Sequence, residues 1–141
     1  MSDLERAKEE LTSGGYTCVI RLGDHQAISH DRGVRPLVAW LDSGERFIGY
    51  SAADKVIGKA TAFLYVLLGV RAVYAHVISK GACAVLQGHG IEVSYQQLVE
   101  NIINRKGDGI CPFEAAVSGC NEPEQAYRII REQMERMGIT I

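Results

Sequence analysis

The stretch from Ser51 to Gly69 constrains this chain most, because its second half would be apolar on every side of a helix. From Ala60 to Leu68 nearly every residue is apolar. A helix of that kind is buried, so we expect it to lie against a sheet with further elements around it. Ser51 and Asp54 have the spacing of a capping box, and Gly69 is typical of a helix end. The pattern therefore predicts one helix over the whole stretch.

Two lysines near the start of this predicted helix need a negative partner. Lys55 and Lys59 are one turn apart and would share a face at the positive end of the helix dipole. Like charges at that spacing cost roughly 0.2–0.5 kcal/mol, and the dipole disfavours cations there. We expect a carboxylate of the chain or an anionic ligand to compensate, unless both lysines are simply solvated. Gly58, between them, indicates a close approach by backbone or ligand, or a packed strand.

Length and composition fit one domain over residues 1–141. The chain has 47% hydrophobic and 23% charged residues, which is ordinary for a globular protein. Its net charge of −2 gives no electrostatic reason to expect nucleic acid or an anionic membrane as a partner. The apolar run is far shorter than the ~20 residues that span a bilayer, and the first residues lack the apolar core of a signal peptide. We expect a cytoplasmic protein.

Cysteines and histidines form no metal-binding pattern. No two cysteines are spaced C-x-x-C, and the four histidines are scattered along the chain. We therefore expect free thiols and no structural metal. The chain also has neither the G-x-x-x-x-G-K-[ST] nor the G-x-G-x-x-G phosphate-binding pattern, and we expect no cofactor.

The rest of the chain predicts alternating helices and strands. Helices are expected over residues 2–12, 36–42, 80–88, 96–103, 112–118 and 121–137. Strands are expected over 17–22, 26–29, 46–50, 71–78 and 91–95. Such alternation predicts an α/β domain with a mixed β-sheet and helices on both faces.

Four blocks of sequence carry a resemblance to a known family. They are Arg32–Leu37, Ala53–Ala60, Ile103–Arg105 and Cys111–Glu114. With the order of the elements, they resemble the cytidine deaminase-like fold and, more narrowly, an uncharacterised prokaryotic family of small domains of unknown function with that fold. The resemblance implies a three-layer sandwich and a ligand position at the start of the central helix.

The resemblance does not extend to deaminase chemistry. Zinc-dependent deaminases begin the central helix with a His or Cys two residues before a Glu, and the next helix with Pro-Cys-x-x-Cys. Here the corresponding residues are Ala52–Lys55 and Ser79–Cys83. These positions supply no set of three metal ligands, so we expect no zinc site and no zinc-dependent deamination.

Three residues are candidates for catalysis. Lys55 could act as a base or form a Schiff base if it is desolvated, and Asp54 could position it or a ligand. Cys111 would be the N-cap of a helix that begins at Pro112, where the helix amides stabilise a thiolate. The alternatives are structural: a capping Asp54, a solvated Lys55 and a buried or capping Cys111.

A second group of polar and basic residues could bind an anionic ligand. Surface-loop roles are the alternative for most of them, and a helix cap is the alternative for Ser79. The group comprises Lys59, Arg32, Arg35, Asn104, Arg105 and Ser79.

Two hypotheses of function follow. The first is a domain that binds a small anionic or nucleotide-like ligand at the N-terminus of the central helix, with or without a reaction. The second is a non-catalytic protein-interaction module that forms a homodimer. The residues do not decide whether the chain is an enzyme.

Overall fold

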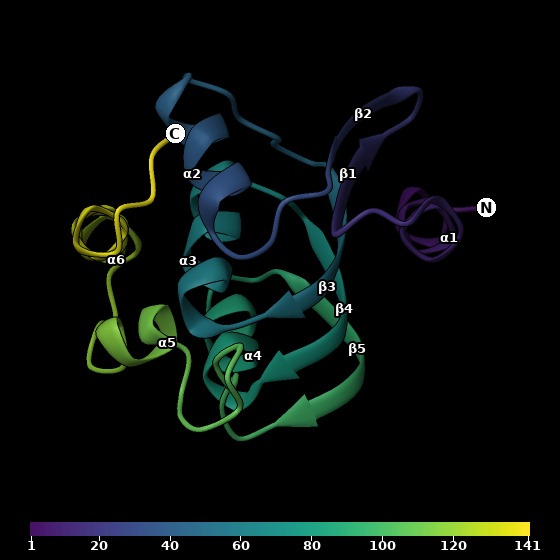
Figure 1. Ribbon diagram of the computed structural model, residues 1–141. Coiled ribbons are helices and arrows are strands. Elements are labelled where there is room, and N and C mark those ends of the chain that lie inside the picture. Colours follow the sequence, from purple (N-terminus) through teal and green to yellow (C-terminus); the bar gives the residue numbers. More distant parts are fainter.

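The computed structural model describes residues 1–141 as one five-stranded sheet with helices on both faces (Figure 1). The strands are β1 (Cys18–Leu22), β2 (His25–Ser29), β3 (Ser51–Ile57), β4 (Ala72–Ser79) and β5 (Glu92–Val99). The helices are α1 (Asp3–Gly14), α2 (Arg35–Asp42), α3 (Lys59–Leu68), α4 (Lys80–Gly88), α5 (Pro112–Ala116) and α6 (Pro123–Arg136). No helix is long and apolar enough to cross a membrane.

The sheet is mixed, with the strand order β2-β1-β3-β4-β5. The hairpin strand β1 is antiparallel to both of its neighbours, whereas β3, β4 and β5 run parallel to one another. The parallel strands are connected through α3 and α4. Because β3 and β4 end at the same edge of the sheet, α3 and α4 begin side by side there, where ligands commonly bind in open α/β sheets.

Helix α3 lies in the middle of the molecule. On one face of the sheet, α1 covers β1 and β3, while α2, α3 and α4 lie on the other face (Figure 1). Helices α5 and α6 form a further layer outside α3. Seven of the ten residues of α3 are buried, including Phe63, Leu64 and Tyr65. The expectation of a central helix enclosed by a sheet and other elements is therefore confirmed.

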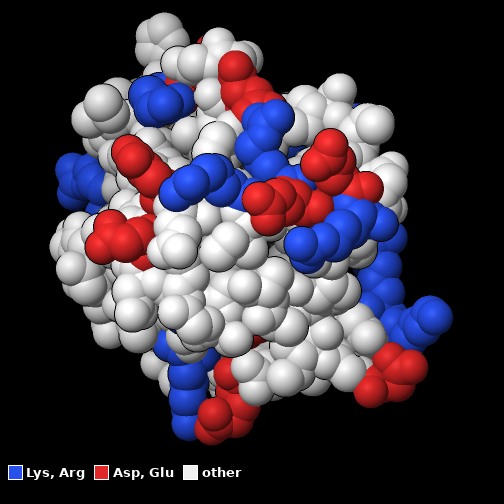
Figure 2. All heavy atoms as spheres, turned by 90° about the vertical axis from the view of Figure 1, so that its left-hand side faces the viewer, with Lys and Arg blue, Asp and Glu red and all other residues white.

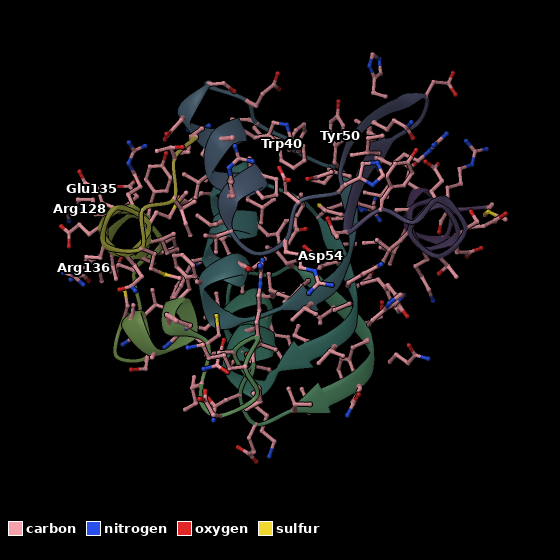
Figure 3. All side chains as sticks on the ribbon, viewed as in Figure 1. Trp40, Tyr50, Asp54, Arg128, Glu135 and Arg136 are labelled. Carbon is pink, nitrogen blue, oxygen red and sulfur yellow. The ribbon has the colours of Figure 1, made fainter.

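Helix α6, in the outermost layer, is buried on one side only, whereas α3 is buried on nearly all sides. The outer side of α6 carries intermixed acidic and basic side chains, and Figure 2 shows them gathered over one part of this face above a mostly uncharged area. Arg128, Glu135 and Arg136 point away from the molecule (Figure 3). The inner side buries Ala126, Ile130 and Met134. Helix α6 is thus an amphipathic cover for α3.

Most of the predicted elements are confirmed, but the stretch from Ser51 to Gly69 is not one helix. It forms strand β3 followed by α3, with Gly58 as the N-cap between them. Ser51 and Asp54 therefore form no capping box: Ser51 pairs with Ala72 of β4. Flanking strands β1 and β4 offer hydrogen-bond ladders on both sides, and this tertiary context outweighs the modest helix propensity of the segment.

Two shorter predictions are also wrong. Residues 46–50 form no strand; the Phe47 amide donates to the carbonyl of Leu68 at 2.7 Å and closes the end of α3. Residues 96–103 form no helix, because β5 continues to Val99 along β4. The following loop folds back on itself through a bridge between Ile103 and Ile110.

Candidate functional site

The N-terminal end of α3 has its negative partner within the chain, and that partner is Glu114. This carboxylate is 6% exposed. Its Oε2 accepts a hydrogen bond from the Lys59 amide at 2.6 Å, and its Oε1 accepts one from the Ile102 amide at 3.0 Å. A carboxylate at this end of a helix is favoured by the free amides and by the dipole. The sequence predicted a negative partner for the ammonium groups of Lys55 and Lys59, but this carboxylate binds the backbone amide of Lys59, and the Lys59 ammonium donates to a carbonyl instead.

Gly58 makes room for this contact. A Cβ at Gly58 would lie 2.5 Å from Glu114 Oε2 and 3.2 Å from Ile102 Cγ1, both too close for an unstrained contact. The close approach at Gly58 is therefore made by the side chains of Glu114 and Ile102, whereas the sequence suggested backbone, a ligand or a packed strand. Glu114 has turned away from its own helix, so it does not complete a cap with Cys111.

Lys59 crosses from α3 toward two neighbouring segments. Its Nζ donates to the carbonyl of Ser118 at 2.9 Å and lies 5.8 Å from the centre of the Phe63 ring. Its stem passes over Gly81 at the start of α4, where an added Cβ would contact Lys59 Cδ at 3.5 Å. Lys59 thus contacts both the start of α4 and the segment that follows α5.

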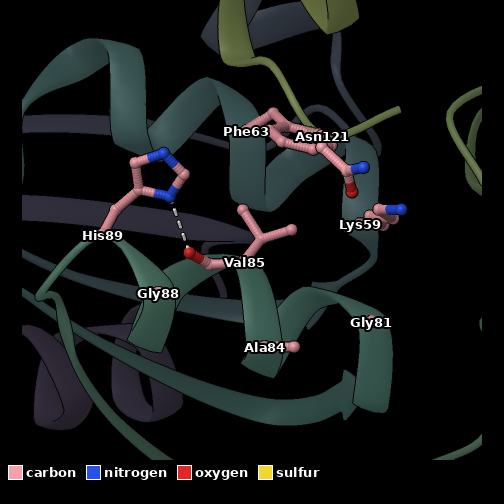
Figure 4. Close-up of a pocket in the computed structure, with 8 residues that line it drawn as sticks. All are labelled: Lys59, Phe63, Gly81, Ala84, Val85, Gly88, His89 and Asn121. Atoms are coloured by element: carbon pink, nitrogen blue, oxygen red, sulfur yellow. Dashed lines mark hydrogen bonds between the residues drawn. The ribbon is translucent and has the colours of Figure 1, made fainter. Parts of the chain in front are cut away.

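A hollow of about 280 Å³ lies beside Lys59, between α3 and α4 (Figure 4). Phe63 and Val85 give it apolar surface, and Asn121 reaches it from the segment between α5 and α6. At the far end, one ring nitrogen of His89, Nδ1, is 2.9 Å from the carbonyl of Val85, so the other, Nε2, is the one left for a ligand. The hollow therefore combines an ammonium, an amide and an imidazole with an apolar floor. Eight residues line it: Lys59, Phe63, Gly81, Ala84, Val85, Gly88, His89 and Asn121.

The two lysines singled out in the sequence are separated by the end of β3. Lys55 belongs to the strand, is exposed, and its amide donates to the carbonyl of Thr17 at 3.1 Å. Lys59 is partly buried and lines the hollow, which Lys55 does not. The expectation that both share one helical face is wrong, because only Lys59 belongs to α3.

Asp54 is held by a chain of hydrogen bonds that leads into the core. Tyr65 of α3 donates its hydroxyl to Asp54 Oδ2 at 2.6 Å, and the Cys18 sulfur lies 3.1 Å from the same hydroxyl. Tyr65 and Cys18 are buried, and Figure 3 places Asp54 between the sheet and the helices. Asp54 thus contacts neither lysine ammonium, and its partner is a tyrosine eleven residues further along the chain.

Burial has the largest effect on the pKa values of Asp54 and Cys18. Desolvation raises the pKa of Asp54 to about 7, although hydrogen bonds from Tyr65 and from the Val56 and Lys55 amides work in the opposite direction. Burial also raises the pKa of the Cys18 thiol, and the charge of Asp54 adds to that effect. Cys18 is therefore a thiol at neutral pH, whereas Asp54 is divided between its two protonation states.

The remaining candidates have local roles or lie in loops. Ser79 is buried, and its hydroxyl caps α4 by accepting from the Ala82 amide at 3.2 Å. Arg35 pairs with Asp31 at 2.9 Å. The Asn104 side chain donates to Asp108 at 2.9 Å, and both Arg32 and Arg105 are exposed. None of these side chains lines the hollow beside Lys59.

Cys111 lies where the sequence predicts it, at the N-cap of α5 before Pro112, and it is partly buried. No three His, Cys, Asp or Glu side chains are grouped as metal ligands would be. Sequence reasoning missed Tyr65 as the partner of Asp54, and it missed Asn121. It also missed the contact of Glu114 with the start of α3, because no local pattern reveals a partner 55 residues away.

Comparison with known proteins identifies the family. The family described as TM1506, a domain of unknown function (DUF1893), matches residues 6–134. The chain belongs to the DUF1893 family. The crystal structure of a DUF1893 family protein (TM1506) from Thermotoga maritima is similar, with a TM-score of 0.84 and 24% sequence identity. The match covers 94% of this chain and 91% of that one. No curated protein matches the chain.

Membership of DUF1893 confirms the expectation that the chain belongs to a family of unknown function. The Thermotoga protein supports the fold of this DUF1893 chain over nearly its whole length. At 24% identity the likeness is one of architecture, so the chemistry of the site must be argued from the residues of this chain.

Replacing Gly58 with alanine tests the Glu114 contact. The new Cβ would displace the carboxylate from the Lys59 amide, and we expect a loss of about 2 kcal/mol in the free energy of unfolding, measured with urea. Gly88→Ala is the matched control, because a Cβ there meets nothing within 4 Å and alanine favours the helix. Equal stability of the Gly58 variant and the wild type would contradict the assignment.

Asp54 should make stability depend on pH. Between its unfolded pKa near 4 and its folded pKa of about 7, the native carboxyl holds a proton that the unfolded chain has lost. The free energy of unfolding should therefore fall as pH rises from 5 to 8, by up to about 2–3 kcal/mol from this group. Asp54→Asn should flatten the profile, whereas Asp24→Asn, in an exposed turn, should not. If the free energy of unfolding falls with pH as steeply in Asp54→Asn as in the wild type, the Asp54 carboxyl is not the source of the pH dependence.

Alkylation rates test the prediction for Cys111. We expect iodoacetamide at neutral pH to modify Cys111 faster than Cys83 or Cys18, and Cys18 last, because that thiol is 2% exposed and its pKa is raised by burial. Mass spectrometry of peptides gives the rates, and Cys111→Ser checks the assignment. If Cys111 reacts no faster than Cys83, its role is structural.

Proposed function

We propose that this chain binds a small anionic ligand in the hollow beside Lys59, at the start of α3. The observation that carries the proposal is the Lys59 ammonium, which donates one hydrogen bond to Ser118 and has two further N–H groups beside the hollow. Asn121 lines the same hollow and adds amide donors. A ligand that carries negative charge would pair with Lys59 and accept from Asn121.

The ligand would meet the side chain of Lys59 rather than the first amide of α3. Glu114 already accepts from the Lys59 amide, and its negative charge opposes a second anion at that position. The anion therefore lies on the α4 side of Lys59, in the hollow that Ala84 and Val85 also line. The site is thus displaced from the helix N-terminus toward the groove between α3 and α4.

The volume of the hollow favours a small ligand. Typical ligand pockets measure about 300–1,000 Å³. At about 280 Å³, this hollow suits a phosphorylated or carboxylated metabolite, or the phosphate and part of the sugar of a nucleotide, better than a whole nucleotide. Phe63 and Val85 would contact the apolar part of the molecule.

We further propose that the fold is of the cytidine deaminase-like type, a sheet between helices, without deaminase activity. The mixed strand order and the adjacent starts of α3 and α4 support this proposal. In zinc-dependent deaminases these two helix starts carry the metal ligands. Here they carry Gly58 and Lys59, and Ser79 to Cys83, of which only Cys83 is a common zinc ligand. These residues do not fit zinc, and no reaction step is assigned to it.

Thermal shift with Lys59→Met tests the site. Inorganic phosphate, ribose 5-phosphate and AMP are the probes, and a probe at 100 times its Kd should stabilise by about 2.7 kcal/mol, which raises Tm by roughly 5–10 °C. Lys59→Met keeps the stem over Gly81 and Phe63 but removes the charge, so the shift should disappear.

Lys55→Ala is the matched comparison, because Lys55 is exposed and does not line the hollow. This variant should retain the full shift. No stabilisation by any probe, or the same stabilisation in Lys59→Met as in the wild type, would refute the proposal. Loss of the shift in Lys55→Ala alone would move the site to the end of β3.

A further inference from the structure

Strand β5 is a free edge of the sheet. It pairs with β4 on one side, and no strand pairs with it on the other. It spans eight residues, against five in β2 at the opposite edge, and lies at the outer margin of the sheet in Figure 1. A long edge strand presents a row of unpaired amides and carbonyls that can pair with another chain.

The hydrogen bonds to β4 fix which groups point outward. The Glu92 amide donates to the carbonyl of Arg71, on the β4 side. In a strand, successive residues direct their amide and carbonyl to opposite sides. The outward amides and carbonyls of β5 therefore belong to Val93, Tyr95, Gln97 and Val99.

Strand β5 lacks the usual protection of an edge. Natural edge strands are blunted by lysine, proline, bulges or short length. The sequence of β5, EVSYQQLV, contains no lysine, arginine, proline or glycine, and its one charge is at Glu92. Tyr95 and Leu98 are 43% and 38% exposed. This edge therefore carries a single charge, has half of its residues apolar, and is open to pairing.

We propose that β5 pairs antiparallel with β5 of a second copy of this chain, about a two-fold axis at Tyr95. Two sheets would join into one continuous sheet of ten strands. In this register Tyr95 faces Tyr95 of the other copy, and Val93 faces Gln97. The outward amides and carbonyls of these residues then bond one another, and the two tyrosine rings lie within reach of each other.

Two antiparallel registers, with the two-fold axis at Tyr95 or at Gln96, place the outward amides and carbonyls of the two copies opposite each other. Charge distinguishes these two registers. A two-fold axis at Gln96 would set Glu92 opposite Glu100 of the other copy, and like charges directly opposite each other are destabilising. An axis at Tyr95 sets Glu92 opposite Leu98 instead, and Glu100 of the other copy, which pairs with Lys80, moves to the diagonal position about 7–8 Å away. The two Glu92 side chains are then about 20 Å apart along the seam, beyond the Debye length of about 8 Å at physiological salt.

This distribution of charge favours a second copy over a foreign peptide. The strand has no cationic or anionic centre that would select a charged partner, and its only charge avoids itself in the antiparallel pair. A strand of the same sequence also matches its length and its outward hydrogen-bonding groups. The inference is independent of the ligand site, because β5 does not line the hollow beside Lys59.

Sedimentation equilibrium over a range of micromolar concentrations tests the proposal. The wild type should reach twice the monomer mass of 15.4 kDa. Tyr95→Lys would place two lysines face to face, and we expect association at least about tenfold weaker. Tyr95→Phe, which keeps the ring, and Gln87→Lys, which adds the same charge on α4, should both remain dimeric.

Circular dichroism establishes that each variant is folded, and amide hydrogen exchange of the wild type gives a second readout. Protection of the Val93, Tyr95 and Gln97 amides should rise with protein concentration. A monomeric wild type at every concentration would overturn the proposal. A dimer that survives Tyr95→Lys, or exchange at β5 that is independent of concentration, would overturn it as well.

Discussion

The carboxylate of Glu114 is the contact on which the arrangement around α3 depends. It joins α5, the first amide of α3 and the segment that follows β5, three parts of the chain that are distant in sequence. Because it is buried, it would be costly without hydrogen-bond donors, and the two amides supply them. The same carboxylate explains Gly58, since any side chain there would collide with it. One acidic residue thus fixes where α3 begins.

This contact also determines what kind of site the chain can offer. The first amide of α3 is occupied, so an external anion must be held by the Lys59 side chain and by neighbouring polar groups. Lys59 is oriented by Ser118 at one end of its side chain and by the space over Gly81 along its stem. Strands β3 and β4 end at the same edge of the sheet, so α3 and α4 begin side by side, and the hollow lies between these two helices. Asp54, which accepts a hydrogen bond from the buried Tyr65, does not line this hollow.

The sequence predicted the architecture better than the site, for a physical reason. Hydrophobic patterning is local, so the buried helix before Gly69, the hairpin and the mixed sheet could all be recognised. The helix predicted from Ser51 failed because strand formation depends on neighbours such as Ala72, which no local pattern reveals. The negative partner predicted for the two lysine ammonium groups is not what the structure shows: Glu114, 55 residues from Lys59, binds the backbone amide of Lys59, and the ammonium donates to the carbonyl of Ser118. The capping role expected of Asp54 failed for the same reason, because Asp54 lies in β3 and its partner Tyr65 approaches from another element.

The central claim is that Glu114 holds the amides of Lys59 and Ile102 at the same time. Amide hydrogen exchange by NMR, in the wild type and in Glu114→Gln, tests it most directly, because a neutral amide cannot accept from both donors equally well. We predict strong protection of both amides in the wild type and a loss of protection at one or both of them in the variant. The amide of Ala62, which donates to the carbonyl of Gly58 at 2.9 Å, should stay protected. Rapid exchange of both amides in the wild type, or unchanged protection in Glu114→Gln, would contradict the account.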